Sequence, residues 1–342
     1  MSHKERICVF GGGAFGTALA QSFAQSGALV RIWARSQVTV DEVNHHKRNL
    51  KYSGETKLHS NISASSNLTQ CFKDSDIWVY ACPSSFFQEF LQALSNGVKT
   101  SQFTAKALVN TCKGLEPKSL RLYHTVAEEI LGEEFLNNFY LTLSGPSFAS
   151  EILHSVPTCV TLSSKSSATL THIQRQLSNP TFRIYTNNDL IGTELGGAMK
   201  NVLAIAAGAI HGLGFGYNTQ AAFINLGLGE MIRLGRAMGA KQETFLGFSG
   251  VGDLLLTCTS PLSRNRSFGN LLGEGKSVDE AFKICASTIE GYTSSKIIFE
   301  LTKQKIVRAP ICEQVYLTLH EAKSLKEAVQ DLLNNPPRAE WV

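Results

Sequence analysis

Residues 9–36 read VFGGGAFGTALAQSFAQSGALVRIWARS, with glycines at positions 11, 13 and 16. A short apolar run, residues 6–10, precedes the glycines, and a stretch typical of a helix follows them. A chain that passes from strand to helix through GxGxxG must turn sharply, approach a ligand with its backbone and pack helix against strand. The helix N-terminus adds partial positive charge. The stretch therefore predicts that Gly11, Gly13 and Gly16 bind the pyrophosphate of a dinucleotide.

The first half of the chain continues the alternation of short β-branched runs with helical stretches. This pattern is typical of a parallel sheet whose two faces are covered by helices. Period and composition predict strands at residues 6–10, 29–34, 76–82, 106–112, 139–144, 158–162 and 182–186.

After residues 187–189 the pattern changes to a 3.6-residue period throughout. Capping boxes at Ser277–Glu280 and Ser324–Glu327 mark two helix starts. A chain of 342 residues is also long enough for two cores. We therefore predict an α/β protein with an N-terminal Rossmann-type doubly wound sheet, residues 1–189, followed by an all-helical C-terminal domain, residues 190–342.

Composition narrows the classes of partner. The net charge of +4 is small, and the charged residues are scattered along the sequence. This distribution suits an anionic small molecule and gives little support for a nucleic-acid partner. The eight cysteines form no CxxC pair and no metal-ligand spacing, so we expect buried thiols, no metal site and a reducing compartment. The apolar run at residues 202–210 is too short to span a bilayer. We expect a cytoplasmic protein without membrane insertion.

The end of the second predicted strand bears on the choice of cofactor. A carboxylate about 20 residues past the glycines would accept hydrogen bonds from the ribose 2′-hydroxyl of NAD. The segment IWARS carries Arg35 there instead, and a guanidinium can pair with the 2′-phosphate of NADP. The alternative is a solvated surface arginine. We predict that NADP is preferred and NAD tolerated.

Two lysines and one aspartate are candidates for catalysis. Lys200 stands alone among small and apolar residues in LGGAMKNVLAIAAG, where partial desolvation would suit it to proton transfer. Lys113 follows a predicted parallel strand, at the edge where open α/β sheets bind ligands. Asp253 precedes an apolar helical run, so it is either a helix N-cap or a carboxylate acting beside Lys200.

A cluster of donors follows at residues 263–266, which read SRNR. Two guanidiniums, a carboxamide and a hydroxyl suit a phosphate dianion, and Arg264 can bind two of its oxygens at once. Such clusters also occur on plain surfaces.

The sequence resembles the bacterial type of NAD(P)-dependent glycerol-3-phosphate dehydrogenase over nearly its whole length. The resemblance rests on GGGAFGTALA, NTCKGLE, LSGPSFASEI, ELGGAMKNVLAIAAGAIHGLGFGYN, GVGDLLLTCTSPLSRNRSFG and TIEGYTSSK, in that order. It implies a Rossmann-type domain followed by a helical domain, and reduction of dihydroxyacetone phosphate to sn-glycerol 3-phosphate for phospholipid synthesis. It also implies a homodimer. The chain departs from the common family pattern at Gln88, His211 and Leu226.

The resemblance also implies roles for particular residues. Lys200 would be the proton acceptor in the oxidation direction, and Lys113 would touch both cofactor and substrate. The positions matching cofactor contacts, beyond the glycines, Arg35 and Lys113, are Ala14, Phe15, Ala149, Arg264 and Glu290. The positions matching substrate contacts, beyond the two lysines, are Gly145, Ser147, Asp253, Thr257, Ser263, Arg264 and Asn265.

Two other functions are compatible with this architecture. A β-hydroxyacid dehydrogenase would recognise a carboxylate rather than a phosphate, and the two arginines of SRNR argue against it. A dinucleotide-sensing protein without catalysis would be expected to lack Lys200 or Asp253, and both are present.

Overall fold

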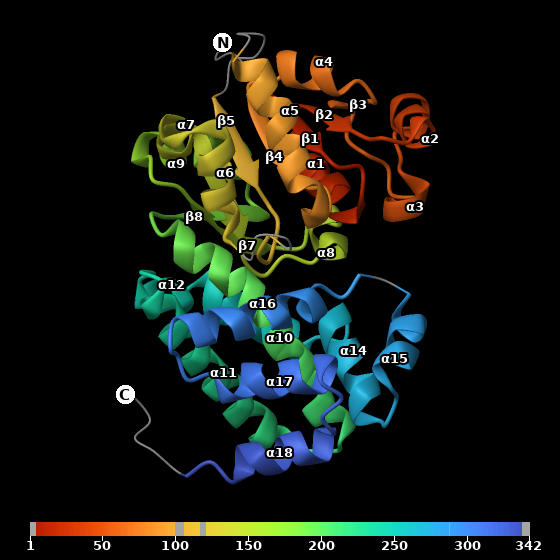
Figure 1. Cartoon of the computed structure of the whole chain (residues 1–342). Coiled ribbons are helices and arrows are strands. Elements are labelled where there is room, and N and C mark those ends of the chain that lie inside the picture. The colour runs from red at the N-terminus through yellow and green to blue at the C-terminus, as the bar shows by residue number, and fades with distance from the viewer. Residues whose placement is uncertain (1–4, 100–105, 117–120, 287, 337–342) are drawn as a thin grey trace. The chain divides into compact units, whose positions relative to one another are not determined.

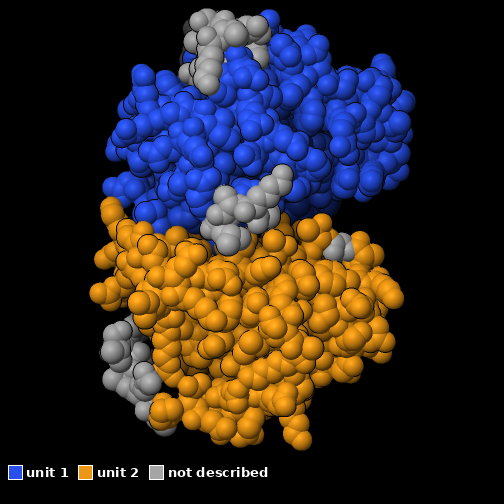
Figure 2. Space-filling model, in the orientation of Figure 1, with its two compact units in different colours: residues 1–194, 247–249 blue, residues 195–246, 250–342 orange. Residues whose placement is uncertain are grey.

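The computed structural model describes residues 5–99, 106–116, 121–286 and 288–336 (Figure 1). Within these residues the chain forms two compact units, residues 1–194 with 247–249 and residues 195–246 with 250–342, coloured separately in Figure 2. The first unit contains all the described strands, and the second is built from helices. The predicted fold class is confirmed.

Unit 1 is a sheet of eight strands in the order β3-β2-β1-β4-β5-β6-β7-β8. The strands are β1 (Arg6–Phe10), β2 (Leu29–Trp33), β3 (Ile62–Ser65), β4 (Ile77–Tyr80), β5 (Ala107–Asn110), β6 (Tyr140–Ser144), β7 (Thr158–Ser163) and β8 (Phe182–Asn187). The seven predicted strands are all present. The strand β3, ISAS, was not predicted, because it has only four residues and its serines and alanine have little β-propensity.

The predicted parallel sheet has one exception, since β6 and β7 run antiparallel. The connection between them, residues 145–157, contains only the five-residue helix α8 (Ala149–Leu153), which packs against α1 (Ala14–Gln25). Because β7 starts at the edge where β6 ends, this connection never crosses the sheet. Residues 145–149 therefore stay at the carboxyl edge of the strands.

Helices cover both faces of the sheet. Alternate residues of β1 point to opposite sides, so Ile7 and Val9 join a core with α1 and α9, and Cys8 and Phe10 join a core with α4 to α7. The remaining unit 1 helices are α2 (Gln37–Asp41), η1 (Glu42–His46), α3 (Leu50–Ser53), α4 (Leu68–Lys73), η2 (Ser84–Phe86), α5 (Phe87–Lys99), α6 (Tyr123–Leu131), α7 (Glu133–Phe139) and α9 (Ser167–Leu177).

The long helix α10 (Leu190–Gly212) begins in unit 1 and continues into unit 2. The elements that follow are α11 (Tyr217–Ala237), α12 (Gln242–Phe245), η3 (Phe248–Gly252), α13 (Asp253–Thr259), α14 (Arg264–Gly273), α15 (Val278–Cys285), α16 (Glu290–Gln304), α17 (Pro310–His320) and α18 (Leu325–Leu333). Both predicted capping boxes are present, at Ser277 for α15 and Ser324 for α18.

Two glycines let α14 approach α10 closely. A Cβ on Gly208 would lie 2.0 Å from the Arg266 carbonyl oxygen, and one on Gly269 would lie 1.8 Å from that of Ile205. Only glycine allows this backbone contact. It fixes the segment that carries the SRNR cluster beside the helix that carries Lys200.

None of the described helices alone is long and apolar enough to cross a membrane. The bent pair Gln242–Thr259 and Arg264–Gly273, which meets at 48°, passes the same test of length and composition.

Candidate functional site

The glycine turn joins β1 to α1, and two of the three motif glycines, Gly11 and Gly16, are required by packing. Gly11 has φ +136°, and a Cβ there would lie 2.5 Å from the Ala81 carbonyl oxygen. A Cβ on Gly16 would lie 1.9 Å from the carbonyl oxygen of Gly11. These glycines hold β1, β4 and the start of α1 together, as the sequence predicts.

Gly13 differs from the other two, because a Cβ there would meet no protein atom within 4 Å. The residue is the N-cap of α1, with no side-chain capping hydrogen bond and no acidic residue in the first turn. Protein packing gives no reason for glycine here, whereas close approach of a phosphate to the backbone does. Ala14 and Phe15 follow it in the first turn of α1. The turn thus fits a dinucleotide pyrophosphate.

Arg35 lies just past the end of β2 and is exposed. Residues 33–36 read WARS, so no carboxylate stands at this strand end. Ser36 caps α2 by accepting a hydrogen bond from Thr39 N. The end of β2 therefore carries the guanidinium of Arg35 and the hydroxyl of Ser36. A protein that binds the ribose 2′-hydroxyl of NAD would carry an acidic side chain at this position.

Lys113 reaches from the end of β5 to the loop that follows β6. Its Nζ donates to the Gly145 carbonyl oxygen at 2.8 Å and to Ser147 Oγ at 3.2 Å. Ser147 Oγ also donates to the Gly145 carbonyl oxygen, at 2.8 Å. Ala149 opens α8 two residues later. The structure therefore brings together Lys113, Gly145 and Ser147, although Lys113 lies 32 residues before Gly145 in the sequence.

In unit 2, Lys200 is buried, with only 6% of the residue exposed, and Asp253 is 1% exposed. Lys200 Nζ lies 2.6 Å from Asp253 Oδ1 and donates to Thr257 Oγ1 at 3.1 Å. Thr257 Oγ1 in turn donates to the Asp253 carbonyl oxygen at 2.6 Å. A buried ammonium requires such partners, since an unpaired charge would be very costly in an apolar interior.

The position of Asp253 distinguishes between the two interpretations of this residue. Gly252 is the N-cap of α13 and Asp253 is its first helical residue. The carboxylate therefore points to Lys200 instead of capping the helix. Asp253 and Thr257 lie one turn apart on α13, so both side chains reach the same ammonium.

The SRNR cluster lies at the start of α14. Ser263 is its N-cap and accepts a hydrogen bond from Arg266 N at 3.2 Å. Arg264, the first helical residue, is exposed, whereas Asn265 is buried. Asn265 Nδ2 donates to Asn201 Oδ1 at 3.0 Å, which leaves its second N–H for another acceptor. Arg264 is thus the accessible charged donor of the cluster.

Asn201 and Glu290 extend this group. Asn201 Nδ2 donates to Glu290 Oε2 at 3.0 Å, and the Gly291 amide donates to Asn265 Oδ1 at 2.9 Å. Asn201 was not predicted from the sequence. Its signal was present, because a carboxamide inside the apolar helix of Lys200 needs partners.

A second buried polar cluster, also missed from sequence, surrounds Glu194 on the first turns of α10. Its side chain is fully buried and accepts hydrogen bonds from the Thr142 hydroxyl at 2.8 Å and the Tyr140 hydroxyl at 3.1 Å. It also accepts from the backbone amide of His124, whose Nδ1 lies 3.0 Å away. Burial lowers the pKa of His124, but the Glu194 carboxylate outweighs this and raises it. The cluster ties α10 to β6 and α6.

The eight cysteines are all free, as expected, but only Cys8, Cys71, Cys258 and Cys312 are fully buried. Cys258 lies near Lys200, and burial raises the pKa of its thiol to about 12. In the described part of the chain, no group of three or more His, Cys, Asp or Glu side chains could hold a metal ion.

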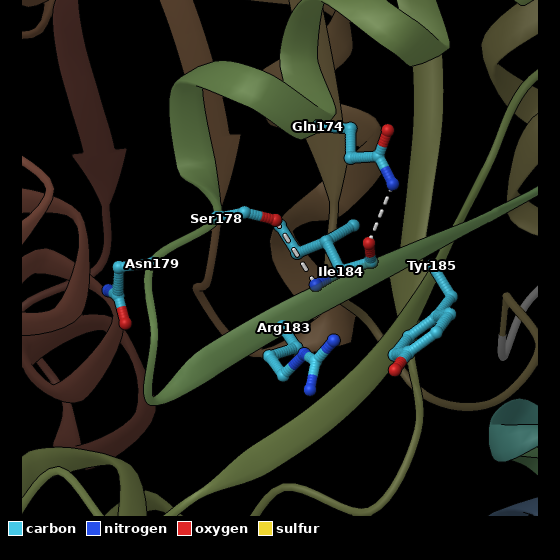
Figure 3. A pocket seen from close by; sticks show the side chains of 6 residues that line it. All are labelled: Gln174, Ser178, Asn179, Arg183, Ile184 and Tyr185. Carbon is cyan, nitrogen blue, oxygen red and sulfur yellow. Dashed lines mark hydrogen bonds between the residues drawn. The ribbon is translucent and has the colours of Figure 1, made fainter.

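A small cavity of about 280 Å³ lies on unit 1 beside α9 and β8 (Figure 3). Gln174 Nε2 donates to the Ile184 carbonyl oxygen at 2.8 Å, and Ile184 N donates to Ser178 Oγ at 3.2 Å. None of the predicted site residues lines it, so it contributes nothing to the site above. It is lined by Gln174, Ser178, Asn179, Arg183, Ile184 and Tyr185.

The glycine turn on the first strand of a Rossmann-type sheet, combined with a helical unit that buries a lysine–aspartate pair, defines a dinucleotide-binding oxidoreductase. Two family models identify the family within this class. Residues 6–170 match the N-terminus of NAD-dependent glycerol-3-phosphate dehydrogenase and residues 189–330 match its C-terminus. The chain belongs to the NAD-dependent glycerol-3-phosphate dehydrogenase family, and the resemblance seen in the sequence is confirmed.

Individual relatives agree with this assignment. A glycerol-3-phosphate dehydrogenase [NAD(P)+] of Staphylococcus aureus is 39% identical over 335 residues, covering 98% of this chain and 99% of the relative. The crystal structure of a glycerol-3-phosphate dehydrogenase from Coxiella burnetii is 36% identical, covers 97% of this chain and 99% of its own, and has a TM-score of 0.88. A D-mandelate dehydrogenase shares the fold alone, at 12% identity and a TM-score of 0.59 over 92% of this chain and 97% of its own.

Proposed function

We propose that this chain interconverts dihydroxyacetone phosphate and sn-glycerol 3-phosphate with NADP or NAD, and that its product supplies glycerophospholipid synthesis. The observation that supports the proposal is the buried Lys200–Asp253–Thr257 group, because an ammonium held by such partners is suited to proton transfer. We also propose residues 1–189 as the cofactor domain and residues 190–342 as the substrate domain.

The cofactor is held by the glycine turn and the first residues of α1 in this proposal. Backbone amides at the helix N-terminus bind the pyrophosphate, and Arg35 pairs with a 2′-phosphate, which makes NADP the preferred form. When bound, the reduced cofactor, NADPH or NADH, would supply the hydride. The remaining cofactor contacts are Ala14, Phe15, Lys113, Ala149, Arg264 and Glu290.

The protein's own side chains manage charge during the reaction. As hydride reaches carbon 2 of the ketone, the carbonyl oxygen becomes an alkoxide, and Lys200 Nζ gives it a proton. In the oxidation direction the neutral amine takes the proton back. Asp253, 2.6 Å from Nζ, balances the ammonium charge, and Thr257 fixes the direction of the Nζ hydrogens. Lys113 stabilises negative charge on the substrate oxygen.

The substrate phosphate is held by the start of α14 in the same proposal. Arg264 supplies two parallel donors, and Asn265 and Ser263 add polar contacts. Gly145 and Ser147 bind the remainder of the three-carbon chain. Because binding energy from a remote phosphate restrains a small substrate, it contributes to the rate as well as to affinity.

The test is NADPH oxidation by the wild-type protein with three substrates. Dihydroxyacetone phosphate should turn over, and dihydroxyacetone, which lacks the phosphate, should lose at least about 100-fold in kcat/KM. A 3-oxoacid, the substrate type of a β-hydroxyacid dehydrogenase, should not react. Failure with dihydroxyacetone phosphate, or a preference for the 3-oxoacid, contradicts the proposal.

We further propose a homodimer located in the cytoplasm. The free state of all eight cysteines supports a reducing compartment. Exposed large apolar side chains on unit 2, such as Tyr217 and Leu262, support a contact between copies. Sedimentation equilibrium would test the dimer, and a monomer at micromolar concentration would contradict it.

A further inference from the structure

Unit 2 contains a second feature that the proposed reaction does not use. A cavity of about 720 Å³ opens among α10, α11, α17 and α18, within the range of roughly 300–1,000 Å³ typical of small-molecule sites. Its walls are mainly aliphatic, with Ile205, Ile210, Phe223, Val315 and Leu319 inside and the more exposed Leu213, Phe215, Leu226 and Leu333 also lining it. Neither Lys200 nor any residue of the SRNR cluster lines this cavity.

Two polar atoms in the wall of this cavity have no hydrogen-bond partner among the described residues. These atoms are Gln314 Oε1 and Thr318 Oγ1, and both are buried. They lie one turn apart on α17, so both belong to the same face of that helix. A buried polar atom without a partner is costly, and native proteins rarely keep one without a reason. Gln314 Oε1 can only accept a hydrogen bond, whereas the Thr318 hydroxyl can donate one to an anion. The Thr318 hydroxyl therefore points to a ligand with an acceptor group.

Two arginines also line the cavity. Arg233 Nε donates to the Arg308 carbonyl oxygen at 3.1 Å, and Arg308 Nη2 donates to Asn335 Oδ1 at 2.7 Å. Within the described ranges, neither guanidinium forms an ion pair with a carboxylate. The one acidic wall residue, Glu230, accepts the backbone amides of Ile311 at 2.7 Å and Cys312 at 3.0 Å. Two positive charges thus remain for an anionic group beside an aliphatic cavity.

We propose that this cavity binds a single-chain fatty-acid anion, with its hydrocarbon chain among the aliphatic side chains and its carboxylate at Arg233 and Arg308. An aliphatic wall suits a flexible hydrocarbon chain, and the guanidinium fork suits a carboxylate. Charge complementarity favours this occupant over an apolar surface of a second copy of the chain, because a carboxylate would pair with Arg233 and Arg308.

The test is isothermal titration of the full-length wild-type protein with sodium dodecanoate below its micelle concentration. We expect one saturable site. Since each buried methylene contributes about a fourfold gain, tetradecanoate should bind on the order of tenfold more tightly and decanoate on the order of tenfold more weakly. The neutral 1-dodecanol should bind about tenfold more weakly than dodecanoate.

Variants locate the site. Ala222 lines the cavity and is exposed on α11, so Ala222→Trp should fill the space without disturbing the core and should abolish binding. Arg233→Gln with Arg308→Gln should weaken dodecanoate at least tenfold and leave 1-dodecanol unchanged. The matched control is Arg236→Gln, an exposed arginine on the same helix that does not line the cavity. It should bind like the wild type, and circular dichroism confirms that each variant is folded.

Several outcomes would overturn the proposal. These are the absence of saturable binding, binding that survives Ala222→Trp, or equal weakening in Arg236→Gln. A second copy in the groove is also distinguishable: Leu226→Asp would then dissociate the proposed dimer, and neither the wild type nor this variant would bind dodecanoate. Because the readout is binding, failure here leaves the proposed reaction untouched.

Discussion

Replacing Gly13 with alanine separates the demands of folding from those of the cofactor. The residue has φ −81° and ψ −178°, which alanine adopts freely, and its Cβ would meet no protein atom within 4 Å. Because alanine is a poorer N-cap than glycine, we expect a decrease of less than about 1 kcal/mol in the free energy of unfolding. Cofactor binding should suffer far more, since the methyl group occupies the space that the pyrophosphate needs.

The size of that effect follows from the hydrogen bonds that the methyl group would prevent. Hydrogen bonds to a charged group contribute about 1.5–3 kcal/mol each, so the absence of one or two amide–phosphate bonds should weaken NADPH binding about 100-fold. Fluorescence titration of NADPH measures the dissociation constant, and urea denaturation measures stability. Gly16→Ala should behave oppositely, because its methyl would lie 1.9 Å from a backbone oxygen, and we expect a decrease of at least about 3 kcal/mol in stability.

Gly216→Ala is the matched control, since this glycine is also the N-cap of a long helix, with open space around its Cβ and no capping side chain. It should show a similarly small decrease in stability, less than about 1 kcal/mol, and an unchanged affinity for NADPH. A Gly13→Ala variant that binds NADPH within threefold of the wild type, or that is destabilised as much as Gly16→Ala, would refute the assignment of Gly13 to the pyrophosphate.

Three further predictions follow from the same structure. Arg35→Gln should reduce the ratio of kcat/KM for NADPH to that for NADH roughly 10- to 100-fold. The control Lys57→Gln, at another exposed position, should leave this ratio unchanged. An unchanged ratio in Arg35→Gln refutes the assignment of Arg35 to the 2′-phosphate. Lys200→Met leaves the Asp253 carboxylate, which is 1% exposed, without its ammonium partner, and should lower the free energy of unfolding by roughly 3–5 kcal/mol in urea denaturation. The double variant Lys200→Met/Asp253→Asn should recover most of this stability but no activity. Equal stability of the single and double variants would count against the buried pair. Burial raises the pKa of Glu230 from 4.5 to about 7, so the protonated carboxyl stabilises the fold. This contribution, about 3 kcal/mol, is present below pH 4.5 and is lost as the pH rises to 7. The free energy of unfolding of Glu230→Gln should not show this fall, and parallel pH profiles of the two proteins would be inconsistent with the raised pKa.

Local signals made much of unit 1 predictable. The glycine turn and the seven predicted strands each consist of contiguous residues whose period and turn chemistry agree with the final fold. The reversal between β6 and β7 was not predictable in this way, because it depends on whether residues 145–157 cross the sheet. That choice is made by the packing of α8 against α1, two helices that are far apart in the sequence.

The candidate site was predictable as residues but not as contacts. Lys200 was conspicuous because an ammonium is unusual in an apolar helix, yet its partner Asp253 lies 53 residues away and was equally compatible with a helix cap. Asn201 and Glu194 were overlooked because a single buried amide or acid leaves no periodic signal.

The proposed reaction depends on proton transfer by Lys200 while dihydroxyacetone phosphate is reduced. The single-turnover rate of NADPH oxidation at saturating dihydroxyacetone phosphate, compared between the wild type and Lys200→Ala, measures this step itself. Loss of a general acid should slow this rate by roughly 10²–10⁴-fold, while NADPH binding stays within a few-fold of the wild type. An unchanged rate in the folded variant would contradict the role of Lys200.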